Sequence, residues 1–195
     1  MAGYSTQPLT VDTWPAFAAL VDAHNGVFGG CWCLGFHAKV VGLDYGQRRD
    51  AKQALVAAGR AHAALVYDGE ACVGWCQFGP PAELPEIKNK KNYAATQTGE
   101  PPPWRLTCFF VDRHRRRQGV AAAALQGALQ QIARLGGGVV EAYPENTAGK
   151  LVSPTFLHAG TLAMFEKAGF RIDRQIGKNK WVVRKTVRAA SGRSP

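Results

Sequence analysis

One strand–turn–helix–strand stretch constrains the fold of this chain more than any other feature. It begins with residues 106–111, a short apolar run rich in β-forming residues, which is typical of a strand buried on both faces. A basic turn at residues 112–119 follows, and apolar residues at helical spacing occupy 121–132. Three glycines at 136–138 predict the end of that helix, because glycine adopts the left-handed cap conformation easily. A second strand is then expected over residues 139–143.

The turn at residues 112–119 has the features that a phosphate group needs. A helix that begins just after a strand points unpaired N–H groups, and the positive end of its dipole, at the space above the sheet. Gly119 would let a phosphate approach the backbone, and the alanines at 121–124 keep side chains out of the way. The arginines of the turn add positive charge. The turn therefore predicts a diphosphate cradle, although a solvated basic run before an ordinary crossover helix would have the same composition.

The motif in this turn is not one of the common nucleotide-binding motifs. The chain contains no Gly-x-x-x-x-Gly-Lys-Ser/Thr loop, and the turn has no Gly-x-Gly-x-x-Gly. It resembles the acetyl-CoA motif of the GNAT superfamily of acyl-CoA N-acyltransferases, Arg/Gln-x-x-Gly-x-Gly/Ala. Residues 164–170 are similar to the family's short helix ending in Glu-Lys-x-Gly-Phe, so the clear resemblance covers the second half of the chain. The residues that match the acetyl-CoA motif are Val111 in the strand, then Arg116, Arg117, Gln118, Gly119, Val120 and Ala121.

The resemblance implies an α/β (α+β) fold with a mixed, mostly antiparallel central sheet, helices on both faces and splayed central strands. It implies one acetyltransferase domain, which we assign to residues 1–187, and we expect a disordered tail at 188–195. Acetyl-CoA would be the cosubstrate, with its diphosphate on the amides of residues 116–121. Its pantetheine arm would pair with the backbone of Phe109, Phe110 and Val111, and its thioester would lie between the two splayed strands.

Acetyl transfer to an amine needs a base, a donor for the thioester carbonyl and a proton for the leaving thiolate. Many family members carry a tyrosine four residues before the terminal glycine of the last helix. Here this cofactor-site position is Phe165, which has no hydroxyl, so water, Tyr143 or a cysteine would have to supply the proton. For the base, Glu141 on the central strand is the first choice, His158 the second and His37 the third.

The segment at residues 29–37 mixes glycines with cysteines and aromatic side chains and has no clear period. In the family, the region after the first helix borders the acceptor site. The resemblance therefore implies that Trp32, Phe36 and His37 shape an acceptor pocket. The aromatic Cys-Trp-Cys segment and the two long loops suggest that this pocket is enclosed and takes the primary amine of a small molecule, such as a metabolite or an antibiotic. Packing of Trp32 and Phe36 in the core is an equally open interpretation.

The remaining segments predict further elements of one domain. The insertion at residues 79–103 could be a lid over the site or only a surface excursion. The helix at 44–60 should bury Ala51, Ala54, Leu55 and Ala58. The other expectations are a loose N-terminus at 1–8, a helix at 13–25, a hairpin of residues 63–67 and 71–78, a helix at 161–168 and a hairpin of residues 170–172 and 181–184.

Composition limits the class of protein. A length of 195 residues with 46% hydrophobic residues suits one globular domain, and no apolar run approaches the ~18 residues of a membrane span. The N-terminus has neither a basic nor an apolar signal region, so we expect a cytoplasmic protein with its five cysteines reduced. We expect no metal, because the pair Cys31 and Cys33 lacks the usual Cys-x-x-Cys spacing of zinc sites.

Two alternatives to the enzyme remain open at this point. A net charge of +10 also fits a nucleic-acid-binding module, but aromatic residues are not interleaved with the basic ones and no RNA- or DNA-binding motif is present. The chain could also bind an acyl-CoA as a sensor, because Phe165 replaces the usual acid. The sequence leaves the oligomeric state open, a homodimer included.

Overall fold

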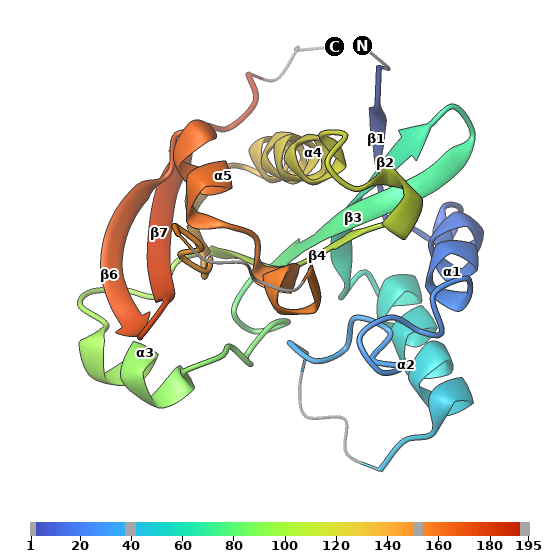
Figure 1. The fold of residues 1–195 in the computed structure, drawn as a ribbon, viewed down its shortest axis with the longest axis horizontal. Coiled ribbons are helices and arrows are strands. Elements are labelled where there is room, and N and C mark those ends of the chain that lie inside the picture. Colours follow the sequence, from blue (N-terminus) through green and yellow to red (C-terminus); the bar gives the residue numbers. More distant parts are fainter. Residues whose placement is uncertain (1–2, 38–41, 150–153, 192–195) are drawn as a thin grey trace.

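The computed structural model describes residues 3–37, 42–149 and 154–191. Its centre is one seven-stranded sheet in the order β1-β2-β3-β4-β5-β7-β6 (Figure 1). Within these residues β4 and β5 form the one parallel pair, and the other neighbouring strands are antiparallel. The strands are β1 (Ser5–Pro8), β2 (His62–Asp68), β3 (Ala71–Gly79), β4 (Trp104–Val111), β5 (Gly138–Ala142), β6 (Arg171–Gly177) and β7 (Lys180–Val187).

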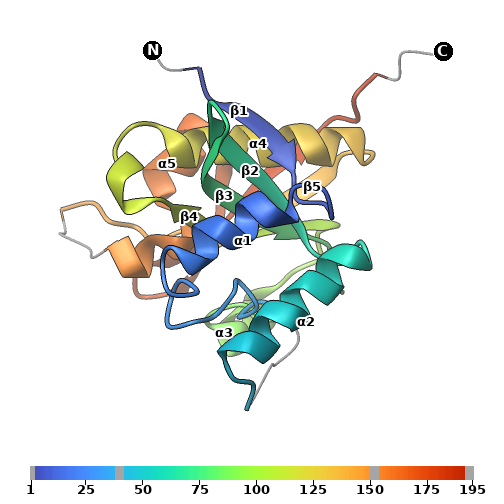
Figure 2. The same cartoon turned by 90° about the vertical axis from the view of Figure 1, so that its right-hand side faces the viewer.

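Helices cover both faces of this sheet, and α4 and α1 lie on opposite sides of it (Figures 1 and 2). One face packs against α4 (Val120–Arg134) and α5 (Leu162–Lys167). The other packs against α1 (Trp14–Asp22) and α2 (Tyr45–Ala57). Among the described helices, none is both long and apolar enough to cross a membrane. The short elements are α3 (Lys90–Thr96) and two 3-10 helices, η1 (Arg113–Arg115) and η2 (Pro154–Ala159).

Strand β4 separates two hydrophobic cores. Its side chains alternate across the sheet, as the pleat of a strand requires. Phe109 packs in the core under α4, whereas Cys108 and Phe110 pack in the core under α1. The strand is therefore buried on both faces, as its continuous apolar sequence predicts.

The central strands part in the middle of the sheet. Strand β5 pairs with β4 only at Trp104, Arg105 and Leu106. At the next residue, Thr107, the β3–β4 register slips, because Phe78 pairs with Leu106 while Gln77 pairs with Cys108. This extra residue is a β-bulge, which bends a strand and increases its local twist. From Thr107 onward β4 keeps β3 as its strand partner and turns a free edge to β5, so the expected mixed sheet with splayed strands is confirmed.

Three local expectations from the sequence differ from the structure. Residues 5–8 are not loose but form β1, an edge strand paired with β2. In α2 the buried residues are Lys52 and Val56, whereas the predicted Ala54 and Ala58 are exposed. The beginning of the expected tail is attached, because the Ala190 N–H donates to the Ala133 carbonyl at 2.8 Å; residues 192–195 lie outside the described part.

The insertion at residues 79–103 is attached to the sheet through α3. Tyr93 of α3 is buried and donates its hydroxyl proton to Glu141 of β5, with an O–O distance of 2.7 Å. The neighbouring Asn92 Nδ2 donates to the Ile176 carbonyl of β6 at 3.1 Å. These bonds fix the insertion against the C-terminal half of the sheet, so it is more than a surface excursion.

Candidate active site

The turn between β4 and α4 presents a series of unpaired backbone donors. Gly119 caps α4 in the left-handed conformation, with φ of 89°, and Arg117 also has a positive φ of 61°. The first helical bond of α4 runs from the Ala123 N–H to the Gly119 carbonyl. Within the described residues, the N–H groups of residues 116–122 donate to no recorded acceptor. Apart from its two neighbours in the chain, no described residue has a heavy atom within 4 Å of the position that a Gly119 Cβ would take, so the space beside the turn is open.

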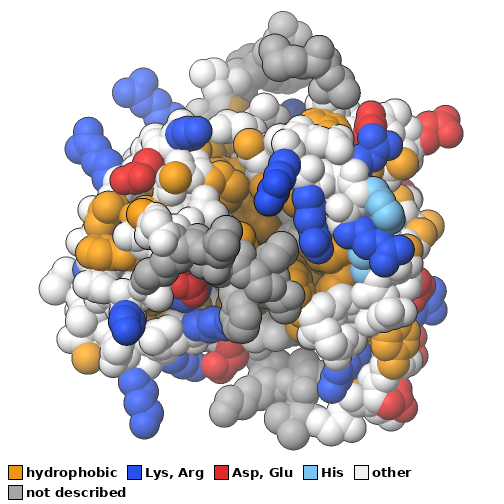
Figure 3. Space-filling model, viewed as in Figure 1, with side chains coloured by type: hydrophobic (Ala, Val, Ile, Leu, Met, Phe, Trp, Pro, Cys, Tyr) orange, Lys and Arg blue, Asp and Glu red, His pale blue; other side chains and the backbone are white. Residues whose placement is uncertain are grey.

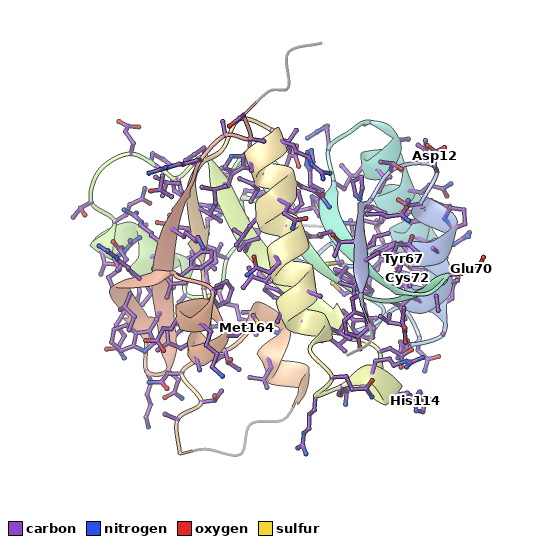
Figure 4. The ribbon with its side chains drawn as sticks, turned by 90° about the horizontal axis from the view of Figure 1, so that it is seen from above. Asp12, Tyr67, Glu70, Cys72, His114 and Met164 are labelled. Carbon is purple, nitrogen blue, oxygen red and sulfur yellow. The ribbon has the colours of Figure 1, made fainter. Side chains whose placement is uncertain are left out.

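The cations of this turn divide into two groups. Arg115 pairs with Asp68 at 2.9 Å, and the Arg113 Nε donates to the His114 Nε2 at 2.9 Å. Arg116 and Arg117 are exposed and belong to none of the ion pairs among the described residues. Figure 4 looks down on α4, whose first turn follows the loop that carries His114. Unpaired amides, a helix N-terminus and two unpaired guanidinium groups together suit a multiply charged phosphate.

The free edge of β4 continues from this turn. Phe109 directs its ring to Phe165, with ring centroids 5.9 Å apart, and Phe110 stacks on Trp75 at 4.7 Å. Their side chains therefore belong to the two cores, and only backbone groups remain to face the gap. Residues 107–111 can thus offer a ligand an unpaired strand edge, which is how extended ligands add to sheets. Figure 3 shows hydrophobic side chains at the bottom of a hollow on this side of the molecule, with Lys and Arg side chains beside it.

Glu141 is the centre of a buried polar network. Its side chain is 0% exposed, and its Oε1 accepts from the Arg184 Nε at 2.8 Å and the Arg184 Nη2 at 2.5 Å. Its Oε2 accepts from the Tyr93 hydroxyl at 2.7 Å and the Tyr143 hydroxyl at 3.1 Å. Both oxygens are therefore engaged by protein donors. A catalytic role for Glu141 stays a prediction, and this geometry is that of a structural hub.

Two further residues expected near the thioester are also enclosed. Burial raises the pKa of Tyr143 well above its usual value, and its hydroxyl proton is donated to Glu141. Phe165 is fully buried between Phe109 and Phe170, with the Phe170 ring centroid at 5.0 Å. Its ring can close the end of the gap but supplies no proton.

A pocket of about 250 Å³ opens beside the segment that follows α1. Of the three predicted acceptor residues, His37 lines this pocket, and Phe36 is half-buried beside it. Trp32 is fully buried and stacks on Trp14 at 6.0 Å, so for Trp32 the structure shows core packing. Four other lining residues belong to the segment 29–37 that was expected beside the acceptor site, whereas sequence reasoning missed Phe28, Arg48 and Glu86, which lie outside it and share no pattern. The described residues that line the pocket are Phe28, Gly29, Cys31, Leu34, Gly35, His37, Arg48 and Glu86.

The backbone around this pocket is strained. Val27 and Phe28 have φ values of 49° and 36°, and Trp32 and Cys33 have values of 50° and 53°. These are left-handed conformations, which cost a non-glycine residue about 1–2 kcal/mol each. Strain of this kind persists where the surrounding structure enforces it, and it concentrates at ligand sites.

A buried lysine lies behind the pocket wall. Lys52 is 1% exposed, and its ammonium contacts the Gln77 Oε1 at 2.8 Å, the His37 Nε2 at 3.1 Å and the Cys33 carbonyl at 3.4 Å. Gln77 in turn donates to the Thr107 hydroxyl at 3.2 Å. This chain of hydrogen bonds connects the pocket to the bulge at which β4 leaves β5.

The lysine also sets the protonation of its neighbours. Burial, and then the positive charge of Lys52, lower the pKa of His37 to about 3, so this imidazole is neutral at physiological pH and a poor base. Burial lowers the pKa of Lys52 itself. Burial alone would raise the pKa of Cys33, but a hydrogen bond from Cys108 and the charge of Lys52 lower it to about 7. Among the described residues no group of three metal-ligating side chains could hold a metal ion.

His158 lies where the pocket and the gap approach each other. It belongs to η2, which packs against β4. Its ring contacts Phe28 at a centroid distance of 5.6 Å and Phe36 at 5.9 Å. Phe28 also contacts Phe110 of β4 at 6.0 Å and lines the pocket. Among Glu141, Tyr143 and His158, it is His158 whose described contacts reach the acceptor pocket.

Comparisons with known proteins agree with this geometry. Residues 17–152 match the family model described as the acetyltransferase (GNAT) family. No curated protein matches the chain significantly.

Solved structures share the fold at low sequence identity. A histone acetyltransferase HPA2 and related acetyltransferase from Corynebacterium glutamicum has a TM-score of 0.53 and 18% identity, over 100% of both chains. The ribosomal-protein-alanine N-acetyltransferase from Brucella melitensis has a TM-score of 0.53 and 14% identity, over 93% of this chain and 99% of that one. The protein yncA from Salmonella typhimurium, solved with its cofactor acetyl-CoA, has a TM-score of 0.51 and 12% identity, over 98% of this chain and 97% of that one. Since the family model covers more than half of the sequence, this protein is a member of the GNAT acetyltransferase family.

Proposed function

We propose that the protein is an N-acetyltransferase that transfers an acetyl group from acetyl-CoA to a primary amine of a small molecule, directly and within a ternary complex. The observation that carries this proposal is the row of unpaired N–H groups at residues 116–122, which continues from the free edge of β4. The GNAT family uses acetyl-CoA, and both features suit it chemically.

In this proposal the chain binds the cofactor mostly through its backbone. The amides of residues 116–121 hold the diphosphate, and Arg116 and Arg117 add charge at its periphery. The edge at Phe109, Phe110 and Val111 pairs with the pantetheine arm, so the thioester lies between β4 and β5. A backbone N–H of this edge is then the donor that stabilises the carbonyl oxygen as it gains charge.

The acceptor occupies the pocket beside His37 and reaches the gap past Phe28. His158 takes a proton from the amine, whose nitrogen forms the new bond to the acetyl carbon while the carbon–sulfur bond breaks. The CoA thiolate leaves and takes a proton from water, since Phe165 has none to give. In our proposal Glu141 and Tyr143 hold β5, α3 and β7 in place and do not move protons in the reaction.

Two measurements test this function. Isothermal titration should show acetyl-CoA binding in the micromolar range, and no heat at about 100 μM would contradict the proposal. Release of free thiol, followed with a chromogenic disulfide in the presence of a panel of amines, should depend on both the amine and the enzyme. Binding without turnover of any amine would instead indicate an acyl-CoA sensor.

A further inference from the structure

Arg48 places a positive charge in the wall of the acceptor pocket. It comes from the first turns of α2, and its Nη1 donates to the Gly30 carbonyl at 3.2 Å and the Gly29 carbonyl at 3.5 Å. A guanidinium has five N–H donors in a planar fork, and these two contacts involve one nitrogen. Gly29 and Gly30 thus fix the orientation of Arg48, while its other nitrogens have no recorded partner among the described residues.

The charge of Arg48 is not balanced within the described residues. None of the ion pairs found there includes Arg48. Glu86, the acidic member of the described lining, is paired with Lys90 at 3.0 Å. The Lys52 ammonium behind His37 adds positive charge, and the thiolate form of Cys33 beside it balances part of that charge. Arg48 is therefore the charged group of the described lining that has no ion-pair partner.

The size of the pocket limits the acceptor. A volume of about 250 Å³ is below the 300–1,000 Å³ that is typical of sites for drug-sized ligands. This volume suits a small metabolite better than a drug-sized molecule. The aliphatic and aromatic part of the wall, Phe28 and Leu34, leaves room for an apolar portion of the ligand.

We propose that the acceptor is a small amino acid-like molecule, in which Arg48 binds a carboxylate while the primary amine reacts. This inference rests on the proposed acetyltransferase function and specifies its substrate class. A guanidinium and a carboxylate form two parallel hydrogen bonds, which fix the position of the ligand as well as its charge. Phe28 lines the same pocket and contacts both His158 and Phe110, so an amine near the carboxylate lies close to the base and to the thioester gap.

Matched pairs of acceptors test the inference in the full-length protein. Each of the standard amino acids with a primary amine is compared with the amine that lacks its carboxylate, for example methionine with 3-(methylthio)propylamine and phenylalanine with phenethylamine. Thiol release from acetyl-CoA gives kcat and KM for each. For the preferred pair we expect the amino acid to have a kcat/KM at least about tenfold above that of the amine.

Three variants test whether Arg48 causes the preference for the amino acid over the matched amine. Arg48→Gln should lower kcat/KM for the amino acid about 10- to 100-fold, mainly through KM, and change that of the matched amine less than about threefold. Arg48→Lys should recover part of the loss, since it keeps the charge but not the fork. Arg134→Gln, which removes an exposed charge at the end of α4, is the matched control and should change neither.

Different failures have different meanings. Equal turnover of both members of every pair, or an equal loss for both in Arg48→Gln, overturns the substrate class and leaves the acetyltransferase function standing. A higher kcat/KM for the amine than for its matched amino acid would also overturn the substrate class. If that difference disappeared in Glu86→Gln, Glu86 would be the residue that recognises a cationic acceptor. Absence of turnover with all amines while acetyl-CoA binds contradicts the proposed function itself.

Discussion

At the scale of single residues, Lys52 and His37 show how burial controls protonation near the pocket. A lysine is seldom fully buried unless its ammonium is satisfied, and here Gln77, His37 and the Cys33 carbonyl supply three acceptors. His37 accepts from this ammonium and remains neutral. The pair fixes the pocket wall, and the pKa of His37, at about 3, lies below the range in which an acetyltransferase base must work.

The neutral state of His37 makes folding stability depend on pH. Its pKa is about 3 in the folded protein and 6.5 as an ordinary value, so below pH 6.5 the unfolded chain binds more protons than the folded one. The contribution of His37 to the free energy of unfolding is therefore fully present above pH 6.5 and is lost as the pH falls toward 3. Between pH 7.5 and pH 5.0 we expect the free energy of unfolding to fall by about 2 kcal/mol from this group, measured by urea denaturation.

The matched variant for this prediction is His37→Gln. It should lower stability at pH 7.5 but show a smaller decrease between pH 7.5 and pH 5.0 than the unmodified protein. Equal pH dependence in the two proteins would show that His37 is not the group responsible.

The variant Glu141→Gln tests whether Glu141 has a structural role or acts as the catalytic base. The substitution breaks the ion pair between the buried Glu141 carboxylate and Arg184, whose side chain is 28% exposed, so the cost should lie below the about 3–5 kcal/mol of a fully buried pair that loses one partner. We expect a lower midpoint in urea, while kcat per folded molecule changes less than tenfold.

His158→Ala should have the opposite effect, with a loss of kcat of about 10²- to 10⁴-fold and little loss of stability. A stable Glu141→Gln protein without turnover would restore Glu141 as the base.

At the scale of elements, the gap depends on how β3, β4 and α4 meet. Gly74 lies at this junction, where an added Cβ would come within 2.6 Å of the Phe110 carbonyl oxygen and 2.8 Å of the Val120 Cγ1. Gly74→Ala should therefore push β3 away from β4 and α4, costing about 1–3 kcal/mol of stability and weakening acetyl-CoA binding. Chemical denaturation and isothermal titration measure the two effects.

Gly46 in the first turn of α2 provides the control for this substitution. A Cβ there would meet only the Asp44 Oδ1 at 3.5 Å, an ordinary contact. Gly46→Ala should leave acetyl-CoA binding unchanged and raise helix stability by about 0.5–1 kcal/mol. If the two variants behave alike, the close approach at Gly74 does not matter to the site.

The elements of the fold were more predictable than their contacts. The strand, basic turn and helix at residues 104–134 are determined by local periodicity and by Gly119, and the structure confirms them. The bulge at Thr107 leaves no such signal, because threonine is an ordinary strand residue and the bulge exists only in its pairing with β3. The burial of Lys52 was equally unpredictable, since its partners come from two segments that lie far from each other in the sequence, Cys33 and His37 in one and Gln77 in the other.

At the scale of the whole molecule, the net charge of +10 favours polyanionic ligands, and the turn before α4 concentrates part of it. If Arg116 and Arg117 attract the phosphates of acetyl-CoA, replacing both with glutamine should weaken binding about tenfold in low salt. The difference should shrink as salt is added, because these side chains are exposed. Arg113→Gln is the control, since its guanidinium is directed to His114.

The central claim is that the amides between Arg116 and Ala121 hold a diphosphate while the free edge of β4 holds the pantetheine arm. A crystal structure of the acetyl-CoA complex tests it most directly. We predict diphosphate oxygens at about 2.7–3.2 Å from these amide nitrogens, with the thioester between β4 and β5 beside Phe28 and His158. A diphosphate bound elsewhere, or β5 paired with β4 beyond Leu106 in the complex, would contradict the account.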